Sequence, residues 1–428
     1  RSTPLYSSAA SDVYKRQDEG KGRSMKERKL NRKEKFYSEY CSGCGLCKAA
    51  QDVQYVDYNG FSYPLSLTED QVELCEKICP VNGINYNKRQ DKELWGPSYG
   101  IYKGWSLDDK IRYEAASGGV ITAMACFLVE TGKCDAVIQV GPSPDDPCEL
   151  RLYANEKREQ IISCASSRYI TGITYDTILN IIDYDKEYVV IGKPCDIEAI
   201  INYTKIDEKL KKCIKYTMTF FCAGAPSKNA TLKLAENLGV QADQIDSVRY
   251  RGNGWPGKAT VTLKDKSERH MDYIDSWNQI LGRNIRKMCK FCVNGVGMYA
   301  DISCGDLWNL DQNQRPEFTE GKGQNIIFAR SKAGSDLLTE ARDSGYIYME
   351  DYTKMDNLKY IQPNHFNMQT TMIGKIVGLK LCTLWGGGGS LVPKYNIKKL
   401  YKASKGTSKI KLVRTVIGTV KRIIKGSI

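Results

Sequence analysis

The chain has 428 residues, enough for two or three domains with cores of their own, and 16 of them are cysteine. So many thiols, several at ligand spacing, exclude a small disulfide scaffold and favour metal ligation in a reducing compartment. The net charge of +13 comes from the end of the chain, because residues 357–428 hold 14 Lys and Arg and no Asp or Glu. That distribution argues against nucleic acid as the main partner. With no apolar run of membrane-spanning length and no visible secretory signal, we expect a cytoplasmic protein.

The first residues are predicted to be a disordered or artefactual basic N-terminus, residues 1–36. Residues 1–17 resemble a translated sequencing adapter more than a protein segment, and the chain starts with Arg1. Met25 is a plausible true start, so residues 1–24 do not enter the fold prediction.

Residues 37–95 are predicted to form a ferredoxin-like module. Its cysteines follow the Cys-x2-Cys-x2-Cys spacing, and the last of them directly precedes Pro80. Ferredoxins with two clusters use two such copies, and the fourth Cys of each ligates the other copy's cluster. Here one site keeps all four ligands and the other keeps only Cys75, which we interpret as a packed thiol. The predicted ligands of one 4Fe-4S cluster are Cys41, Cys44, Cys47 and Cys79.

A structural zinc site is the alternative for this module. Thiolates at Cys-x2-Cys spacing bind zinc as well as iron. Three cysteines in this spacing with a distant Cys-Pro are typical of the cluster pattern, and we therefore favour iron.

Strands and helices alternate in residues 96–345, which predicts an α/β domain with a largely parallel sheet. Ser117 and two glycines open a helix that Gly132 ends. The predicted helices are 120–130, 196–203 and 228–238; the predicted strands are 135–140, 187–191 and 216–221, followed by 245–250 and 258–263, which alternate like antiparallel strands.

A second group of cysteines belongs to this domain. Cys195 and Cys222 each follow a predicted strand, and such strand ends meet at one edge of an open sheet. Cys289 and Cys292 form a Cys-x2-Cys pair downstream. The four thiols could make a second site. Equally, the first two could be small buried residues and the pair half of a zinc site.

Residues 346–428 are predicted to be a C-terminal extension with a basic amphipathic tail. Gly386-Gly-Gly-Gly-Ser390 is expected to be a flexible linker. Beyond it, apolar residues recur at helical spacing among Lys and Arg over 409–425, which is typical of a helix on anionic lipid. A solvated basic tail, or a helix docked on a partner subunit, explains the pattern as well.

Five stretches together resemble the coenzyme F420 (deazaflavin) hydrogenase/dehydrogenase beta-subunit family. They are the module at 41–80, Ser117-Gly-Gly-Val120, Ile191-Gly-Lys-Pro-Cys195, Tyr250-Arg-Gly-Asn-Gly-Trp-Pro-Gly257, and Cys289 to Trp308. The resemblance covers about residues 37–345, and a plant 7-hydroxymethyl chlorophyll a reductase is similar to the same family.

The resemblance implies an FAD flavoprotein with one or two 4Fe-4S clusters. In its reductase-like members, cysteines matching Cys195, Cys222, Cys289 and Cys292 would hold the second cluster. Cys304 departs from the family pattern and could replace one of these ligands.

Residues that suit a flavin lie in the same stretches. A helix N-terminus supplies backbone N–H groups for a pyrophosphate, and Ser, Arg and Asn side chains supply further donors. The predicted cofactor-binding residues are Ser117, Gly118, Gly119, Ser166, Ser167, Arg168, Asn253 and Asp306, and the predicted catalytic residues are Lys193, Arg251 and Trp255. A plain helix cap and a surface loop are the alternatives for Ser117 and Arg168.

The sequence therefore predicts an iron–sulfur flavoprotein oxidoreductase. Its clusters would exchange electrons with ferredoxin or another redox partner, and its FAD would reduce or oxidise an organic substrate or deazaflavin. The alternative is a non-catalytic electron-transfer subunit of a larger redox complex. An anionic membrane surface is a possible further partner of the tail, and nucleic acid is not.

Overall fold

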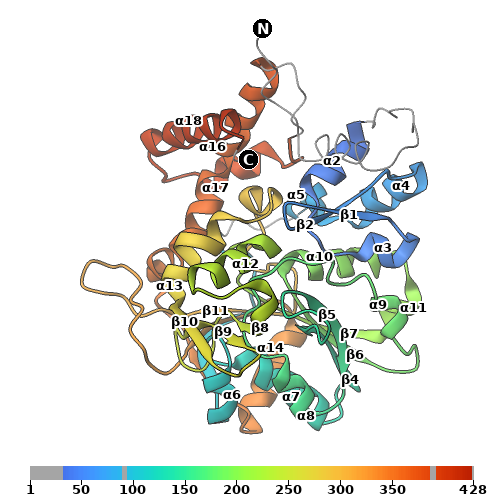
Figure 1. Ribbon diagram of the computed structural model, residues 1–428, viewed down its shortest axis with the longest axis vertical. Coiled ribbons are helices and arrows are strands. Elements are labelled where there is room, and N and C mark those ends of the chain that lie inside the picture. The colour runs from blue at the N-terminus through green and yellow to red at the C-terminus, as the bar shows by residue number, and fades with distance from the viewer. Residues whose placement is uncertain (1–31, 89–93, 386–391, 427–428) are drawn as a thin grey trace.

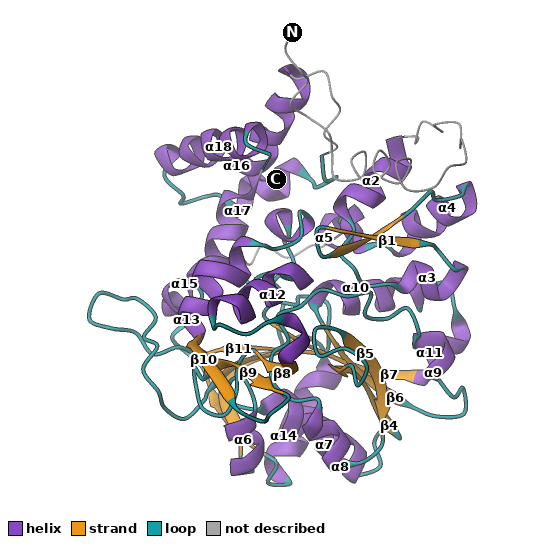
Figure 2. Cartoon of the chain, in the orientation of Figure 1, coloured by secondary structure: helices purple, strands orange, loops and turns teal. Residues whose placement is uncertain are grey.

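The computed structural model describes residues 32–88, 94–385 and 392–426, and its centre is an eight-stranded mixed sheet (Figure 1, Figure 2). The strand order is β13 (Ile347–Asp351), β3 (Gly100–Ser106), β12 (Asn325–Ala329), β11 (Ile302–Asp306), β7 (Ile214–Phe220), β6 (Tyr188–Gly192), β4 (Ala136–Pro142) and β5 (Leu150–Asn155). Strands β4, β6, β7 and β11 are parallel, and the strands flanking them are antiparallel. The predicted α/β class is confirmed, with the parallel strands at the centre.

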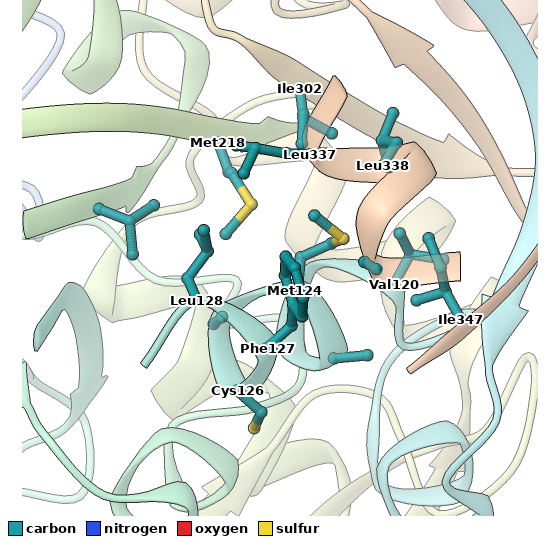
Figure 3. Close-up of a cluster of buried hydrophobic side chains, with 14 of the residues drawn as sticks. Val120, Met124, Cys126, Phe127, Leu128, Met218, Ile302, Leu337, Leu338 and Ile347 are labelled. Atoms are coloured by element: carbon teal, nitrogen blue, oxygen red, sulfur yellow. The ribbon is translucent and has the colours of Figure 1, made fainter. Parts of the chain in front are cut away.

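Helices cover both faces of this sheet. On one face α7 (Val120–Glu130) and α14 (Lys332–Asp343) bury a core that includes Met124, Phe127 and Leu338 (Figure 3). On the other face α10 (Pro194–Tyr203) contacts the strands and the N-terminal module. Strand β6 is buried along its whole length because it contributes alternate residues to both cores, as expected for a parallel strand covered on both sides.

The N-terminal module lies against the α10 face. It consists of α2 (Arg32–Tyr40), α3 (Leu46–Gln51), the hairpin β1 (Tyr55–Tyr58) and β2 (Phe61–Pro64), α4 (Glu69–Ile78) and α5 (Ile84–Lys88). Helix α2 begins inside the segment predicted to be disordered, because Phe36, Tyr37 and Tyr40 on it are buried. Residues 1–31, most of that predicted segment, lie outside the described residues.

The predicted elements of the α/β domain are confirmed to within a few residues. Helices α7, α10 and α12 (Lys228–Asn237) and strands β4, β6 and β7 lie where the sequence placed them. A second, antiparallel sheet consists of β8 (Ile245–Arg249), β9 (Lys258–Leu263) and β10 (Glu268–Asp272). It matches the expectation that residues 245–250 and 258–263 form antiparallel strands. The shorter helices are α6 (Asp109–Glu114), α8 (Arg158–Ser163), α9 (Ile178–Ile181), α11 (Glu208–Cys213), α13 (Tyr273–Asp275) and α15 (Leu358–Ile361).

The C-terminal part is helical and packs back on the body (Figure 1). Its helices are α16 (Pro363–Trp385), α17 (Ile397–Ala403) and α18 (Lys409–Ile424). Strand β13 still belongs to the main sheet, which therefore runs past the boundary predicted at residue 345. The predicted linker at 386–390 lies outside the described residues. No helix in the described ranges is long and apolar enough to cross a membrane.

Helix α18 lies directly on α16 through small residues. A Cβ added at Gly374 would lie 3.1 Å from the carbonyl oxygen of Leu412, and one at Gly378 would lie 2.9 Å from the Cβ of Thr419. The absence of side chains at these two positions lets the backbones come close. The basic tail helix is thus docked on its own chain.

Replacing Gly378 by Ala should loosen this contact. The added methyl group has no room, and overpacking of this kind costs about 1–3 kcal/mol. We expect faster hydrogen exchange of the α18 amides in Gly378→Ala. The matched control is Gly418→Ala on α18 itself, where a Cβ meets nothing within 4 Å and alanine favours the helix by up to about 1 kcal/mol. Equal exchange in the two variants would contradict the close contact.

Candidate functional site

The first four predicted cysteine ligands come together in the N-terminal module. Cys41, Cys44 and Cys47 lie in the turn before α3 and in its first turn, and Cys79 ends α4. Gly43 and Gly45 have positive φ, and a Cβ on Gly45 would collide with Ile173 at 2.3 Å. Burial, and then Cys44, Cys41 and Cys47, raise the pKa of the Cys79 thiol.

The second four also converge, from three separate parts of the chain. Cys195 lies in the first turn of α10, Cys222 follows β7, and Cys289 and Cys292 belong to the short turn that begins at Met288. Burial raises the pKa of Cys222 to about 12, with Cys289 as the next cause. The pKa of Cys292 is raised in the same way, by burial and then by Cys289 and Cys222. The structure thus brings these four thiols together.

Two further cysteines were uncertain from the sequence. Cys304 lies in β11 within the sheet core, and burial raises its pKa with only Arg330 as a charged influence. It lies opposite Phe220 of β7 in the sheet, and it is not among the main causes of the raised pKa of Cys222 or Cys292. Cys75 is buried beside the first quartet, where its thiol lowers the pKa of Cys47 to about 7.

Both quartets are largely buried groups of thiols, and most of these thiols raise the pKa of their neighbours. Thiolates bind metals, so such a group favours a bound cation or cluster that supplies positive charge. Among the residues the structure describes, no three His, Cys, Asp or Glu side chains are placed to hold a single metal ion.

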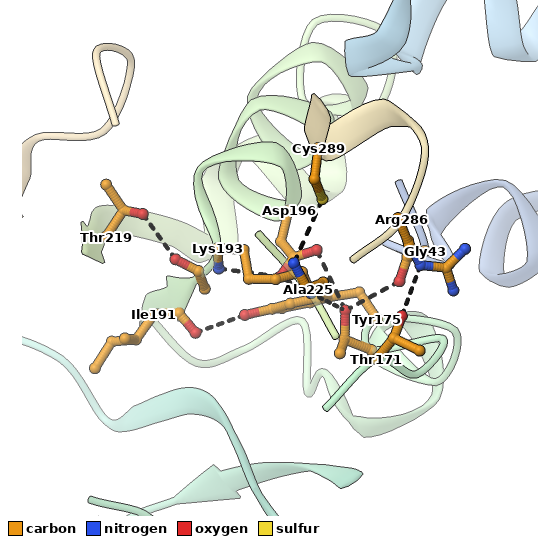
Figure 4. Close-up of polar contacts among 12 residues, drawn as sticks. Gly43, Thr171, Tyr175, Ile191, Lys193, Asp196, Thr219, Ala225, Arg286 and Cys289 are labelled. Atoms are coloured by element: carbon orange, nitrogen blue, oxygen red, sulfur yellow. Dashed lines mark hydrogen bonds and ion pairs between the residues drawn. The ribbon is translucent and has the colours of Figure 1, made fainter. Parts of the chain in front are cut away.

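A polar network joins the two quartets (Figure 4). The amide of Tyr175 donates to the carbonyl of Cys44 at 2.7 Å, and the Tyr175 hydroxyl donates to Ile191 O at 2.6 Å. Lys193 Nζ donates to Thr174 Oγ1 at 3.1 Å and to Asp196 Oδ2 at 2.8 Å. Burial disfavours the charge on Lys193, but Asp196 and Cys195 outweigh it and raise its pKa to about 12. Lys193 is thus a fixed cation beside Cys195.

Arg286 is the second cation between the quartets, and sequence reasoning missed it. It is fully buried, its Nε donates to Thr171 Oγ1 at 2.6 Å, and its Nη1 donates to Ser62 O at 3.0 Å. Its Nη2 is buried without a hydrogen-bond partner within the described part of the chain. The charge of Arg286 counteracts the rise in pKa of both Cys41 and Cys289. An unsatisfied donor at this place fits an anionic cluster held by the thiolates.

A cavity of about 320 Å³ lies at the carboxyl ends of β6, β7 and β11, beside the second quartet. Most of the predicted flavin residues line it. The predicted residues in its wall are Ser117, Gly119, Ser166, Ser167, Arg168, Lys193, Arg251 and Asp306, together with Cys222. The structure therefore brings together side chains that are up to about 190 positions apart in the sequence.

The N-terminus of α7 opens into this cavity. Gly119 has a φ of +77°, and Gly118 packs so closely on β12 that a Cβ would lie 2.7 Å from Asn325 Oδ1. Asn325 also binds Ser117 through its Nδ2, at 3.1 Å, which holds the turn. Arg168 also lines the cavity, and its Nε is buried without a partner in the described residues. The amide of Val120 donates to Asn325 Oδ1 at 3.3 Å, and the remaining N–H groups of the first helical turn together with this guanidinium suit a phosphate group.

An ion pair forms another wall of the cavity. Arg251 binds Asp306 through two hydrogen bonds of 3.0 Å each, and the indole of Trp255 donates to the same carboxylate at 3.0 Å. Trp255 stacks on Trp308 at 4.7 Å, so it supports the wall from behind and does not line the cavity. Gly118 and the exposed Asn253 do not line it either.

Aromatic residues that the sequence prediction left out face the cavity. Tyr273, Trp277 and Phe318 join Trp308 in its wall. His365 lines it too, and burial lowers its pKa to about 4, so it is neutral at pH 7. The aromatic residues lie outside the motifs, in segments without a distinctive spacing. Flat apolar walls with a few fixed charges suit a planar cofactor.

Two sequence profiles match this chain, and both describe the beta subunit named "Coenzyme F420 hydrogenase/dehydrogenase". The profile of its N-terminal part matches residues 101–178, and the profile of its C-terminal part matches residues 185–355. The chain belongs to the coenzyme F420 hydrogenase/dehydrogenase beta-subunit family. The two profiles cover the main sheet and most of the cavity wall, whereas the N-terminal module and α16–α18 lie outside them.

Two relatives of this chain are named as redox enzymes or their subunits. The F420-dependent formate dehydrogenase subunit beta of Methanocaldococcus jannaschii is 24% identical over 56% of this chain and 59% of its own length. The coenzyme F420-dependent sulfite reductase of the same organism is 23% identical over 78% of this chain and 51% of its own length. The chain thus spans about half to three fifths of the length of these relatives.

A solved structure shares the family fold. A chain of the F420-reducing NiFe hydrogenase complex of Methanosarcina barkeri superposes with a TM-score of 0.53 at 18% identity, over 70% of this chain and 98% of that one. At this identity the likeness concerns the fold.

Removing the charge of Asp306 should destabilise the protein strongly. Asp306→Asn leaves Arg251 buried without its counter-ion, and breaking a buried pair costs about 3–5 kcal/mol. The measurement is the urea midpoint of unfolding, and the absorbance of any bound cofactor is followed in parallel because ligand loss also lowers stability. Asp336→Asn, which breaks the exposed pair with Lys332, is the matched control and should stay within about 1 kcal/mol. Equal midpoints would show that the buried pair does not hold the cavity wall.

Proposed function

We propose that this protein is an iron–sulfur flavoprotein oxidoreductase with two 4Fe-4S clusters and one FAD. The observation that carries the proposal is the position of the second cysteine quartet. One of its members, Cys222, lines the cavity in which the predicted flavin residues gather, and Arg286 lies between this quartet and the first. The two clusters and the flavin would form a short electron-transfer chain from the N-terminal module to the cavity.

The cofactors would supply the redox chemistry: clusters carry single electrons, and a flavin combines two of them for an organic substrate or deazaflavin. The residues of the chain would bind these cofactors and orient them. The N-terminus of α7 and Arg168 would hold the pyrophosphate, and Arg251 with Asp306 keeps the aromatic wall in place. Lys193 is a protonated donor at the cavity wall next to Cys195.

A non-catalytic electron-transfer subunit is the second candidate, because relatives are named as beta subunits of larger enzymes. The two functions differ in an anaerobic assay with reduced ferredoxin as the donor. Turnover of deazaflavin by the isolated chain supports the enzyme, and turnover only with a partner protein supports the second candidate.

Iron, sulfide and flavin analysis of the anaerobically purified chain tests the cofactors. We expect about eight irons and one FAD per chain, since each cubane holds four irons. Cys79→Ala and Cys222→Ser should each remove about four irons. Cys75→Ala and Cys304→Ser are the matched controls and should leave iron unchanged. A wild-type total near four, or equal losses in Cys304→Ser and Cys222→Ser, contradicts the assignment of the second quartet.

The tail helix supports a separate proposal, peripheral contact with an anionic membrane. One face of α18 is docked through Thr419 and Ile423. Another presents exposed Ile410, Val413, Ile417 and Ile424 beside Lys and Arg side chains. Apolar residues flanked by cations suit the surface of anionic lipid.

A single charge on the exposed face should weaken this binding. Ile417 is 49% exposed, and Ile417→Glu removes apolar contact and adds repulsion from anionic lipid. We expect a severalfold loss of sedimentation with vesicles of phosphatidylserine and phosphatidylcholine. Ile206→Glu is the matched control, because Ile206 is also 49% exposed but lies between α10 and α11. Equal sedimentation of the two variants rules out α18 as the contact.

A further inference from the structure

A second cavity adjoins the second quartet, next to the tail helix. It measures about 610 Å³ and is bounded by α16, α18 and the turn that carries Cys289 and Cys292. It adjoins the cavity of about 320 Å³, because Cys222, Ala223, Trp277, Asn364 and His365 line both. Helices α16 and α18 follow the last residue matched by the family profiles.

The wall of this cavity is basic. Lys375 on α16 and Lys411, Arg414 and Arg422 on α18 line it, and no Asp or Glu is among its described lining residues. Four cations around one hollow repel one another unless an anion lies between them. The charge pattern therefore selects for a negative ligand.

The two arginines differ from the two lysines in their bonding. Lys375 Nζ donates to Lys290 O at 2.9 Å, and Lys411 Nζ donates to Asn367 Oδ1 at 2.6 Å. For Arg414 and Arg422 no hydrogen bond or ion pair is found within the described residues. Their guanidinium groups are thus available at the cavity, and guanidinium binds phosphate and carboxylate through paired hydrogen bonds.

Other basic residues of the same helix do not belong to this wall. Lys409, Lys421 and Lys425 are exposed on α18 and do not line the cavity. Lys411, Arg414 and Arg422 are exposed as well, so the difference between the two sets is that only these three line the cavity. The close contact of α18 with Gly374 and Gly378 holds the helix in this orientation.

We propose that the cavity between α16 and α18 binds a small anion with two or more negative charges, a phosphate ester or a polycarboxylate. The anion would lie beside Cys222, Cys289 and Cys292, which line the same cavity. Binding needs only the arginines and the docked helix. A redox or regulatory role for the anion rests in addition on the proposed function, because it requires a cluster at the quartet.

Titration calorimetry on the full-length chain at low salt tests the site, with pyrophosphate and citrate as probes and glycerol as the neutral control. We expect both anions to bind and the affinity to fall as NaCl is added. The double variant Arg414→Gln/Arg422→Gln should raise Kd at least tenfold. The matched double variant Lys409→Gln/Lys421→Gln removes the same charge from the same helix and should stay within twofold.

Equal losses of affinity in the two double variants would overturn the proposal, because net charge of the tail would then explain binding. Absence of binding by either anion to the wild type at low salt would overturn it too. Sedimentation with phosphatidylserine vesicles distinguishes a lipid headgroup from a free anion: loss in the cavity variant alone identifies the headgroup as a source of the anion. Hydrogen exchange of α18 shows that the variants stay docked.

Iron and flavin content are measured on the same samples. A chain that binds pyrophosphate through Arg414 and Arg422 but holds neither iron nor flavin supports the cavity and rejects the proposed function. A chain that holds both cofactors but binds no pyrophosphate supports the proposed function and rejects the anion site.

Discussion

The burial of one arginine between two groups of thiols organises this molecule. A buried guanidinium is costly unless negative charge lies nearby, and Arg286 has no acidic partner within the described residues. The thiols of Cys41 and Cys289 are the groups whose ionisation it favours. Because its other bonds reach Ser62 and Thr171, the same side chain ties the N-terminal module to the α/β domain. This arrangement requires a glycine at position 43, since a Cβ on Gly43 would lie 2.7 Å from Arg286 Nη2.

The second quartet adjoins two cavities, and its member Cys222 lines both of them. One cavity has aromatic walls and the two ion pairs Arg251–Asp306 and Lys193–Asp196, and the other has four cations among its described lining residues. Most of the first cavity is built from segments that the family profiles match, although residues 361–365 beyond them complete its wall. The second cavity depends on α16 and α18 for its basic residues, and these helices lie beyond the profiles.

The sequence predicted what depends on local spacing. The first quartet follows from a fixed interval and a Cys-Pro, and α7 follows from its Ser-Gly-Gly start and its Gly132 end. The convergence of Cys195 and Cys222 was predictable because both follow central parallel strands. Arg286, Tyr273 and Trp277 were not, because their importance arises from contacts with segments more than 100 positions away or from the shape of the cavity. The docking of α18 was missed for a similar reason: it depends on Gly374 and Gly378 in another helix.

Residues 394–396 in the C-terminal part of the chain pack against the end of the N-terminal module. The Tyr395 hydroxyl donates to Phe291 O at 3.0 Å, Asn87 donates to Lys394 O at 2.7 Å, and the amide of Asn396 donates to Asn87 Oδ1 at 2.7 Å. On the ribosome, the N-terminal module emerges long before residues 394–396 exist. Its surface against Tyr395 and Leu400 therefore stays uncovered until that later segment has been synthesised.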